Sequence, residues 1–420
     1  MKKKIKVITS YTSIGANIAL GFFLMYIINM FASVYEYGQF MILKSTSGLL
    51  SGILTFRSGE AVTKFYNTYK VEKENGKSKY ILYIGFLSDL FISTFCLVLI
   101  LTISFLFEQG VATWEGLDVK SFTLFGLVSV FTLLRGTSIG YLQAEGKITT
   151  INIINIIECF LISFFVFCFI LINHSLDIMD IVYSHVFSYS IVTFIYLYIL
   201  SLNYFFRLRF NKEKSKNTLL DYFKFSAITF GSSTLKSFNR NSDNIIIAYI
   251  LSPAEVGFYQ SIKKVFSITE IIAQPWSMLT YGRLITLYTK NEITKFKALI
   301  MRTTAYVFLL SLLTSVIIFA FLDNIFSFMK VEPLDSFHSV SIIVFISYLI
   351  LAYSWWARVF SNVIDPMISV KANVFALLIT VFILPITTLY LGLVGVGISF
   401  MLINIGVAIY ISYRFNRVKF

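Results

Sequence analysis

Two lysines occupy matched positions in the two halves of this sequence. Lys44 and Lys263 each lie six residues after the glycine of a Glu-x-Gly motif, which occurs at Glu36–Gly38 and again at Glu255–Gly257. Each lysine is embedded in an apolar stretch, where a charge costs about 2.5–3.5 kcal/mol on insertion scales. A repeated cost of this kind indicates a function, and a flexible ammonium group is suited to holding an anion loosely. The alternative is that both side chains snorkel to a membrane interface.

Three further cations are candidates for the same anion site. Lys236 and Arg240 precede Asp243 at i, i+4, i+7 spacing, so these three residues share one helix face. Arg240 and Asp243 can pair locally at i, i+3. A functional role for this helix face and a structural ion pair between helices are equal alternatives. Lys264 follows Lys263 about 100° further round the helix, so only one of the two can face a cavity directly.

Carboxylates inside the apolar stretches are candidates for coupling to an ion gradient, because a buried carboxylate can carry a proton. They are Glu270, which lies seven residues after Lys263, together with Glu158 and Asp243. For Glu158 the alternative is a hydrogen bond that joins two helices, with Arg135 of the preceding stretch as its partner.

The composition predicts an all-α integral membrane protein. The 420 residues are 57% hydrophobic and 14% charged, whereas soluble domains carry about 25% charged residues. Apolar runs of about 20 residues are long enough to span a bilayer as helices. Twelve such spans are predicted, at 12–34, 38–57, 80–107, 119–142, 148–172, 179–202, 225–251, 257–282, 300–322, 337–360, 367–391 and 394–413.

The loops between these spans alternate in charge. With the N-terminus inside, the inner segments hold most of the 35 Lys and Arg residues, and the outer loops hold only Lys120 and Lys330. Because cytoplasmic loops are enriched in Lys and Arg, both termini are expected in the cytoplasm. The basic segment Met1–Lys6 is expected to precede an uncleaved first helix. The net charge of +13 then follows from topology and from contact with anionic membrane lipids, and nucleic-acid binding is excluded.

The longest basic connection, 203–224, divides the spans into six plus six. We therefore expect an N-terminal lobe at 1–202, a cytoplasmic linker at 203–224 and a C-terminal lobe at 225–420. Both lobes begin inside, so the repeats are parallel, and their axis runs along the membrane normal.

Residues for catalysis, metal binding or cofactor binding are missing from the pattern. The three histidines have no ligand spacing, the three cysteines lie in apolar runs, and there is no Walker A sequence. We expect a transporter without a cofactor and not an enzyme.

Two segments carry a family resemblance. Residues Arg240–Tyr259 (RNSDNIIIAYILSPAEVGFY) resemble the seventh-to-eighth helix signature of polysaccharide repeat-unit flippases, and Ala32–Phe40 is similar to their first outer loop. These O-antigen-type flippases belong to the multidrug/oligosaccharidyl-lipid/polysaccharide exporter superfamily. The resemblance implies two six-helix bundles around a central cavity in a bacterial inner membrane. It also implies translocation of an undecaprenyl-pyrophosphate-linked oligosaccharide to the periplasmic face, coupled to protons or sodium. A polysaccharide polymerase and chain-length proteins are the implied protein partners.

Three related activities are weighed against this interpretation. The lipid II flippases of the superfamily use cavity arginines and carry two extra helices, whereas lysines occupy the candidate positions here. A multidrug/cation antiporter would prefer an acidic cavity, and the candidate charges are mainly cationic. An inner-membrane polysaccharide polymerase would need a long periplasmic loop, and the outer loops are short.

Overall fold

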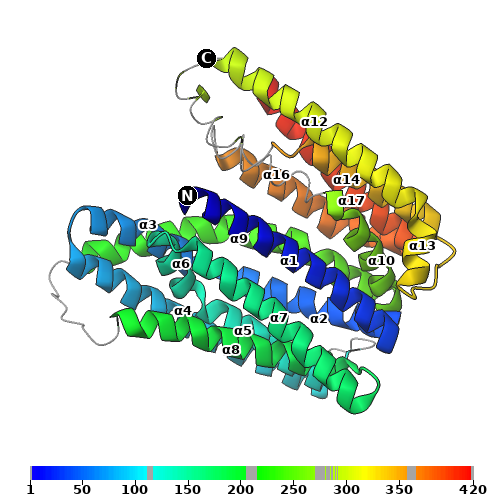
Figure 1. Ribbon diagram of the computed structural model, residues 1–420, viewed down its shortest axis with the longest axis horizontal. Coiled ribbons are helices and arrows are strands. Elements are labelled where there is room, and N and C mark those ends of the chain that lie inside the picture. The colour runs from blue at the N-terminus through cyan, green and yellow to red at the C-terminus, as the bar shows by residue number, and fades with distance from the viewer. Residues whose placement is uncertain are drawn as a thin grey trace. The chain divides into compact units, whose positions relative to one another are not determined.

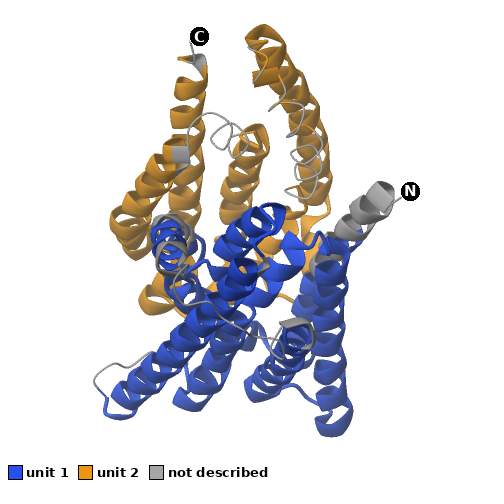
Figure 2. Ribbon diagram, turned by 90° about the vertical axis from the view of Figure 1, so that its left-hand side faces the viewer, with its two compact units in different colours: residues 1–241 blue, residues 242–420 orange. Residues whose placement is uncertain are grey.

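The computed structural model describes residues 2–110, 117–204, 215–269, 292–356 and 366–417, with a few single positions between 280 and 290. The chain forms two compact units, Met1–Asn241 and Ser242–Phe420 (Figure 2). This boundary falls within one long helix. Residues 205–214 of the predicted linker lie outside the described residues, so the division into lobes at 203–224 stays a prediction.

The described part of unit 1 is built of helices that run alongside one another (Figure 1). They are α1 (Lys2–Phe31), α2 (Val34–Leu54), α3 (Ser58–Val71), α4 (Asn75–Glu108), α5 (Val119–Leu134), α6 (Gly136–Ala144), α7 (Ile148–Asn173), α8 (Ile178–Tyr204) and most of α9 (Ser215–Ile250). α5 packs against α2, α4 and α8, while α7 packs against α1 and α8. The short helices α3 and α6 pack against each other.

Unit 2 is also helical over its described residues. Its helices are α10 (Pro253–Phe266), α12 (Ile293–Ala320), α13 (Leu322–Phe328), α14 (Phe337–Tyr353), α16 (Pro366–Leu378), the π-helix η3 (Ile379–Ile383) and α17 (Leu384–Asn416). α14 is central, because it packs against α10, α12 and α17.

Six described helical segments are long and apolar enough to cross a membrane. They are Gly76–Glu108, Val119–Ala144, Ile148–Asn173, Ile178–Ser201, Ile293–Ala320 and Val370–Phe415. Two shorter apolar helices lie at Ala19–Phe31 and Phe337–Tyr353. The predicted number of twelve therefore stays a prediction. One reason is that predicted spans extend into undescribed residues, as at 270–279.

The last of these segments is not one straight helix. Gly392 has φ 57° and ψ −137°, a non-helical conformation within α17, and glycine adopts such angles without the clash that a Cβ would cause. The break falls between the predicted eleventh and twelfth spans. Pro385 is the second residue of α17, which begins directly after the π-helix η3. A π-type turn accommodates the missing N–H of a proline.

Small residues bring α2 and α9 into close contact inside unit 1. The Ser237 hydroxyl donates to the Gly48 carbonyl at 3.0 Å. A Cβ on Gly52 would lie 1.7 Å from the Ser237 hydroxyl oxygen. The pair Gly48 and Gly52 is thus a small-xxx-small pattern of the kind that lets membrane helices approach closely.

One buried carboxylate connects the N-terminal ends of two short helices, α3 and α6. Asp89 of α4, 3% exposed, accepts the backbone N–H of Thr137 at 2.6 Å, in the first turn of α6. It also accepts a hydrogen bond from the hydroxyl of Ser58, the first residue of α3. Helix N-termini carry partial positive charge, which stabilises the carboxylate.

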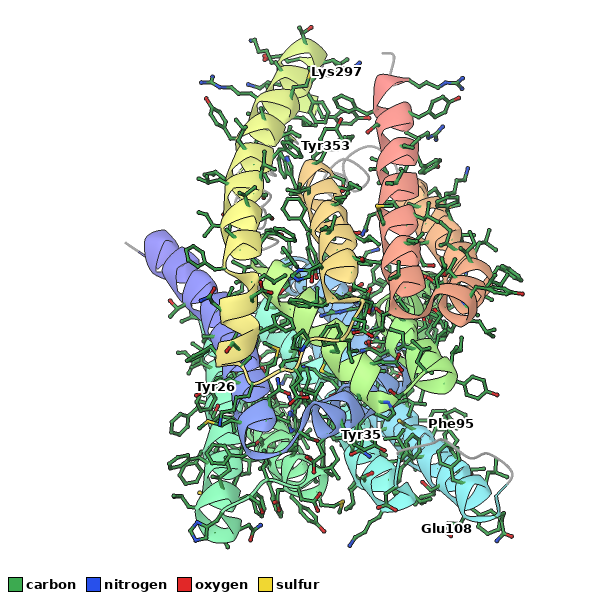
Figure 3. The ribbon with its side chains drawn as sticks, turned by 90° about the vertical axis from the view of Figure 1, so that its right-hand side faces the viewer. Tyr26, Tyr35, Phe95, Glu108, Lys297 and Tyr353 are labelled. Carbon is green, nitrogen blue, oxygen red and sulfur yellow. The ribbon has the colours of Figure 1, made fainter. Side chains whose placement is uncertain are left out.

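Large apolar side chains remain exposed on the outside of both units. Figure 3 shows Phe95 and Glu108 on α4, and Phe95 is 50% exposed. Further examples are Phe160 of α7, Leu313 of α12 and Leu389 of α17, each more than half exposed. Apolar surface on this scale needs lipid around it. The molecule is therefore a multi-pass membrane protein.

Candidate functional site

The repeated Glu-x-Gly motif begins a helix in both halves. Ser33 caps α2 and accepts the backbone N–H of Glu36 at 3.2 Å. Ser252 caps α10 and accepts the backbone N–H of Glu255 at 3.3 Å. Each serine hydroxyl also donates to the glutamate side chain, at 3.0 Å and 2.9 Å respectively. These caps fix the start of each helix, and hence the position of the lysine that follows.

Lys263 of α10 forms an ion pair within unit 2. Its Nζ lies 2.5 Å from Oδ2 of Asp243 on α9, and both side chains are 16% exposed. The ammonium group also lies over two aromatic rings, 5.2 Å from the centroid of Tyr259 and 4.9 Å from that of Phe400. Ring faces attract cations, so the charge is stabilised from three sides.

A second polar pair joins the same two helices. The Gln260 amide donates to the side-chain oxygen of Asn244. Asn244 in turn donates its backbone N–H to Oδ1 of Asp243 at 2.9 Å. The carboxylate of Asp243 is thereby oriented, with one oxygen toward the backbone and the other toward Lys263.

Lys44 of α2 has a different setting, in unit 1. The residue is exposed, and its Nζ lies 5.6 Å from the ring centroid of Phe40, one turn earlier. That ring packs against His185, with centroids 4.9 Å apart, and against Phe125 at 6.0 Å. Lys44 therefore presents a cation beside a buried aromatic cluster.

Glu158 pairs with Arg135, as the alternative interpretation of Glu158 predicted. The guanidinium NH1 donates to the Glu158 carboxylate. The same guanidinium donates to the Thr193 hydroxyl and to the Tyr189 carbonyl, both at 2.9 Å. Arg135 thus ties together the α5–α6 junction, α7 and α8, and this arrangement indicates a connection between helices.

The structure describes the other residues predicted for the site only in part. Asp243 pairs with Lys263 across two helices and not with Arg240, the local partner that the spacing allowed. Arg240 is exposed and has no ion pair within the described part of the chain. Lys264 is partly buried in α10. Lys236 lies in α9, but its side chain is not described. Glu270 lies outside the described residues.

Two structural roles were not anticipated from the sequence. The Ser-x-x-Glu pattern of a capping box is present in both halves, at Ser33–Glu36 and Ser252–Glu255, and begins three residues before the Glu-x-Gly motif. The contact between Asp243 and Lys263 had no such signal, because it depends on how α9 and α10 pack.

The fold and its buried charges define a multi-pass membrane protein with a transporter-like fold. The solved structures similar to this chain are transporters and flippases. An inward-facing multidrug resistance MATE family transporter of the MOP superfamily has a TM-score of 0.74 at 13% identity, with 96% of this chain and 94% of that chain covered. The lipid II flippase MurJ in its inward closed conformation has a TM-score of 0.74 at 13% identity, covering 98% and 87%. The same kind of MATE transporter in an outward-facing conformation has a TM-score of 0.65 at 14% identity, covering 97% and 94%.

The chain belongs to the polysaccharide biosynthesis protein family, whose sequence profile matches residues 2–281. No curated protein sequence matches it significantly. The resemblance found in the sequence is thus confirmed at the level of family and fold.

Proposed function

We propose that this protein is a bacterial inner-membrane flippase for undecaprenyl-pyrophosphate-linked O-antigen or capsule repeat units. The observation that carries the proposal is the pair of lysines, Lys44 and Lys263, each of which lies eleven residues after the serine that caps its helix. A lipid-linked diphosphate is anionic, so it needs cations that can hold it and then release it. The family supports this substrate class, since its members are described as polysaccharide biosynthesis proteins.

The proposed mechanism is alternating access between two lobes. The diphosphate and sugars occupy a cationic cavity that includes Lys44, Lys236, Arg240, Lys263 and Lys264, while the lipid tail stays in the bilayer. Protons or sodium supply the driving force, with Glu270, Glu158 and Asp243 as candidate coupling residues. The fixed pairing of Glu158 with Arg135 makes it the weakest of the three. The polymerase and chain-length proteins act on the product at the outer face.

The experiment is genetic complementation. In a strain that lacks the gene, Lys44→Ala or Lys263→Ala should abolish most surface polysaccharide while membrane levels of the protein remain measurable. Arg variants should partly restore it, since the positive charge is kept. Asp variants should be worse than Ala, because they repel the diphosphate. Full complementation by both Ala variants would show that the lysines merely snorkel.

The proposed orientation has its own test. Reporter fusions after Lys73, Lys214 and Lys295 should behave as cytoplasmic, and fusions after Glu115 and Asp335 as periplasmic. A periplasmic result at Lys214 would contradict the six-plus-six division.

The second candidate is a multidrug/cation antiporter, favoured by the structural likeness to MATE transporters. It makes the opposite prediction for the lysines. Neutralising Lys44 should leave export of a cationic drug unchanged or increase it, and the strain without the gene should keep its surface polysaccharide.

A further inference from the structure

The ammonium group of Lys263 is already paired with a carboxylate of the same chain, that of Asp243. Two aromatic rings cover part of the Lys263 charge, and the hydrogen-bonding position nearest to Nζ is filled by Asp243 Oδ2 at 2.5 Å. A carboxylate oxygen and a phosphate oxygen are both anionic acceptors, and both make short charge-assisted bonds to an ammonium. Asp243 therefore stands where an anionic ligand of Lys263 would bind.

The carboxylate is held in this position before any ligand arrives. Its other oxygen, Oδ1, accepts the backbone N–H of Asn244 at 2.9 Å. Asn244 is itself bonded to Gln260 of α10, one turn before Lys263. Because these contacts orient Asp243 in advance, keeping the ion pair costs little ordering entropy, and a ligand must compete with a preformed partner.

The corresponding position in the first half carries no such group. The residue that stands to Lys44 as Asp243 stands to Lys263 is Leu24 of α1. It is 6% exposed and apolar. The aspartate at this position of α9 is therefore not repeated at the matching position of α1.

We propose that Asp243 is an intramolecular competitor for the diphosphate at Lys263, which makes binding at this position weak and readily reversible. This inference rests on the proposed function, because it takes the diphosphate of a lipid-linked saccharide as the anion. A diphosphate that reaches Lys263 must displace or share with Asp243, and the like charges repel at that distance. Asp243 therefore sets how long the site holds its substrate.

The test is binding of undecaprenyl diphosphate, without sugars, to the full chain in nanodiscs of neutral lipid. Asp243→Asn keeps the size of the side chain and an oxygen that can accept the backbone N–H of Asn244, but it removes the charge. It should bind about tenfold more tightly than the wild type, with slower dissociation. Lys263→Ala should bind more weakly. The double variant should match Lys263→Ala, because the gain from Asn needs the lysine.

Three controls make the result specific. Uncharged undecaprenol should bind all variants equally. Asp323→Asn removes one negative charge from the exposed surface of α13 and should leave the affinity unchanged. If Asp243→Asn is not recovered folded, Asp243→Ser gives the same comparison.

The outcomes separate this inference from the function on which it rests. Unchanged or weaker binding by Asp243→Asn, with loss of binding by Lys263→Ala, would overturn the competitor role and leave the lysine site intact. Wild-type binding by Lys263→Ala would remove the diphosphate site, and the competitor role with it.

Discussion

The connection between α1 and α2 and the connection between α9 and α10 share one frame but differ in the charge they carry. In both, a serine and a glutamate cap the second helix, and a lysine follows two turns later. After the cap the two regions diverge. Lys44 is exposed beside Phe40, whereas Lys263 is mostly covered and paired with Asp243. A repeat can therefore keep a lysine at the same position after the capping motif while its exposure to solvent changes.

The largest expected difference between the two regions is in stability. Lys263→Ala leaves the carboxylate of Asp243 without its counter-ion in a mostly buried site, which should cost about 3 kcal/mol. Lys44→Ala should cost less, because it removes an exposed side chain from beside Phe40 and not one half of a mostly buried ion pair. The measurement is thermal unfolding of the purified variants in detergent. Adding Asp243→Asn to Lys263→Ala should recover most of the loss; equal stability of the two Ala variants would contradict the contrast.

A substitution in α1 can make the surroundings of Lys44 more like those of Lys263. Leu24→Asp places in α1 the carboxylate that α9 carries at Asp243. If α1 and α2 pack as α9 and α10 do, this carboxylate should couple favourably to Lys44 by about 1–2 kcal/mol. The coupling is measured by a double-mutant cycle of unfolding with Leu24→Asp and Lys44→Ala, with Leu24→Asn as the uncharged control. Additive effects would show that the two connections do not superpose at this depth.

Removing the N-cap serine should lower the stability by the same amount in both regions. Ser33→Ala and Ser252→Ala each remove one N-cap, at a cost of about 1 kcal/mol. Thr at either position keeps the hydroxyl and should behave like the wild type. The unfolding temperatures of these four variants test whether the repeated motif acts as a capping device, and a loss in one region only would argue against it.

The smallest effect is expected from an ion pair outside the spans. The Glu145 carboxylate accepts hydrogen bonds from Lys70 at 2.6 Å and from Tyr66 at 2.8 Å. Burial by itself would raise the pKa of Glu145, but these two hydrogen bonds outweigh it and lower the pKa below the ordinary 4.5. A lowered folded-state pKa means that this contribution is present above the unfolded pKa and is lost as the pH falls through the folded one.

Glu145→Gln should therefore destabilise the protein at pH 7 by at most about 1 kcal/mol, as for other pairs near the surface. The difference from the wild type should shrink as the pH falls below about 4.5. Unfolding of both proteins across this range checks the sign. The pair between Lys263 and Asp243, being better covered, should contribute more at pH 7, and the reverse order would break the comparison.

Much of this architecture follows from local sequence, and the exceptions follow from packing. The helical fold, the six long apolar segments among the described residues and the partner of Glu158 were predictable, because long apolar runs and a nearby arginine restrict the choices. The partner of Asp243 was not: Arg240 is close along one helix, but Lys263 is closer across two. The partners of Asp89 were not predictable either, because they depend on α3 and α6 starting at neighbouring points. The number of spans could not be settled by hydropathy where helices carry charges or end early, as α10 does at Phe266.

The position of Asp89 couples two helix junctions of unit 1. Its single carboxylate is bonded to the first residue of α3 and to the first turn of α6. The break between α2 and α3 and the break between α5 and α6 therefore share one anchor. A change in backbone conformation at either of these two breaks would therefore strain the same two hydrogen bonds. A Cβ on Gly136 of α6 would lie 2.4 Å from the hydroxyl oxygen of Ser58. Substitutions at Ser58 and Gly136 should consequently be non-additive, although they lie in different helices far apart in the sequence.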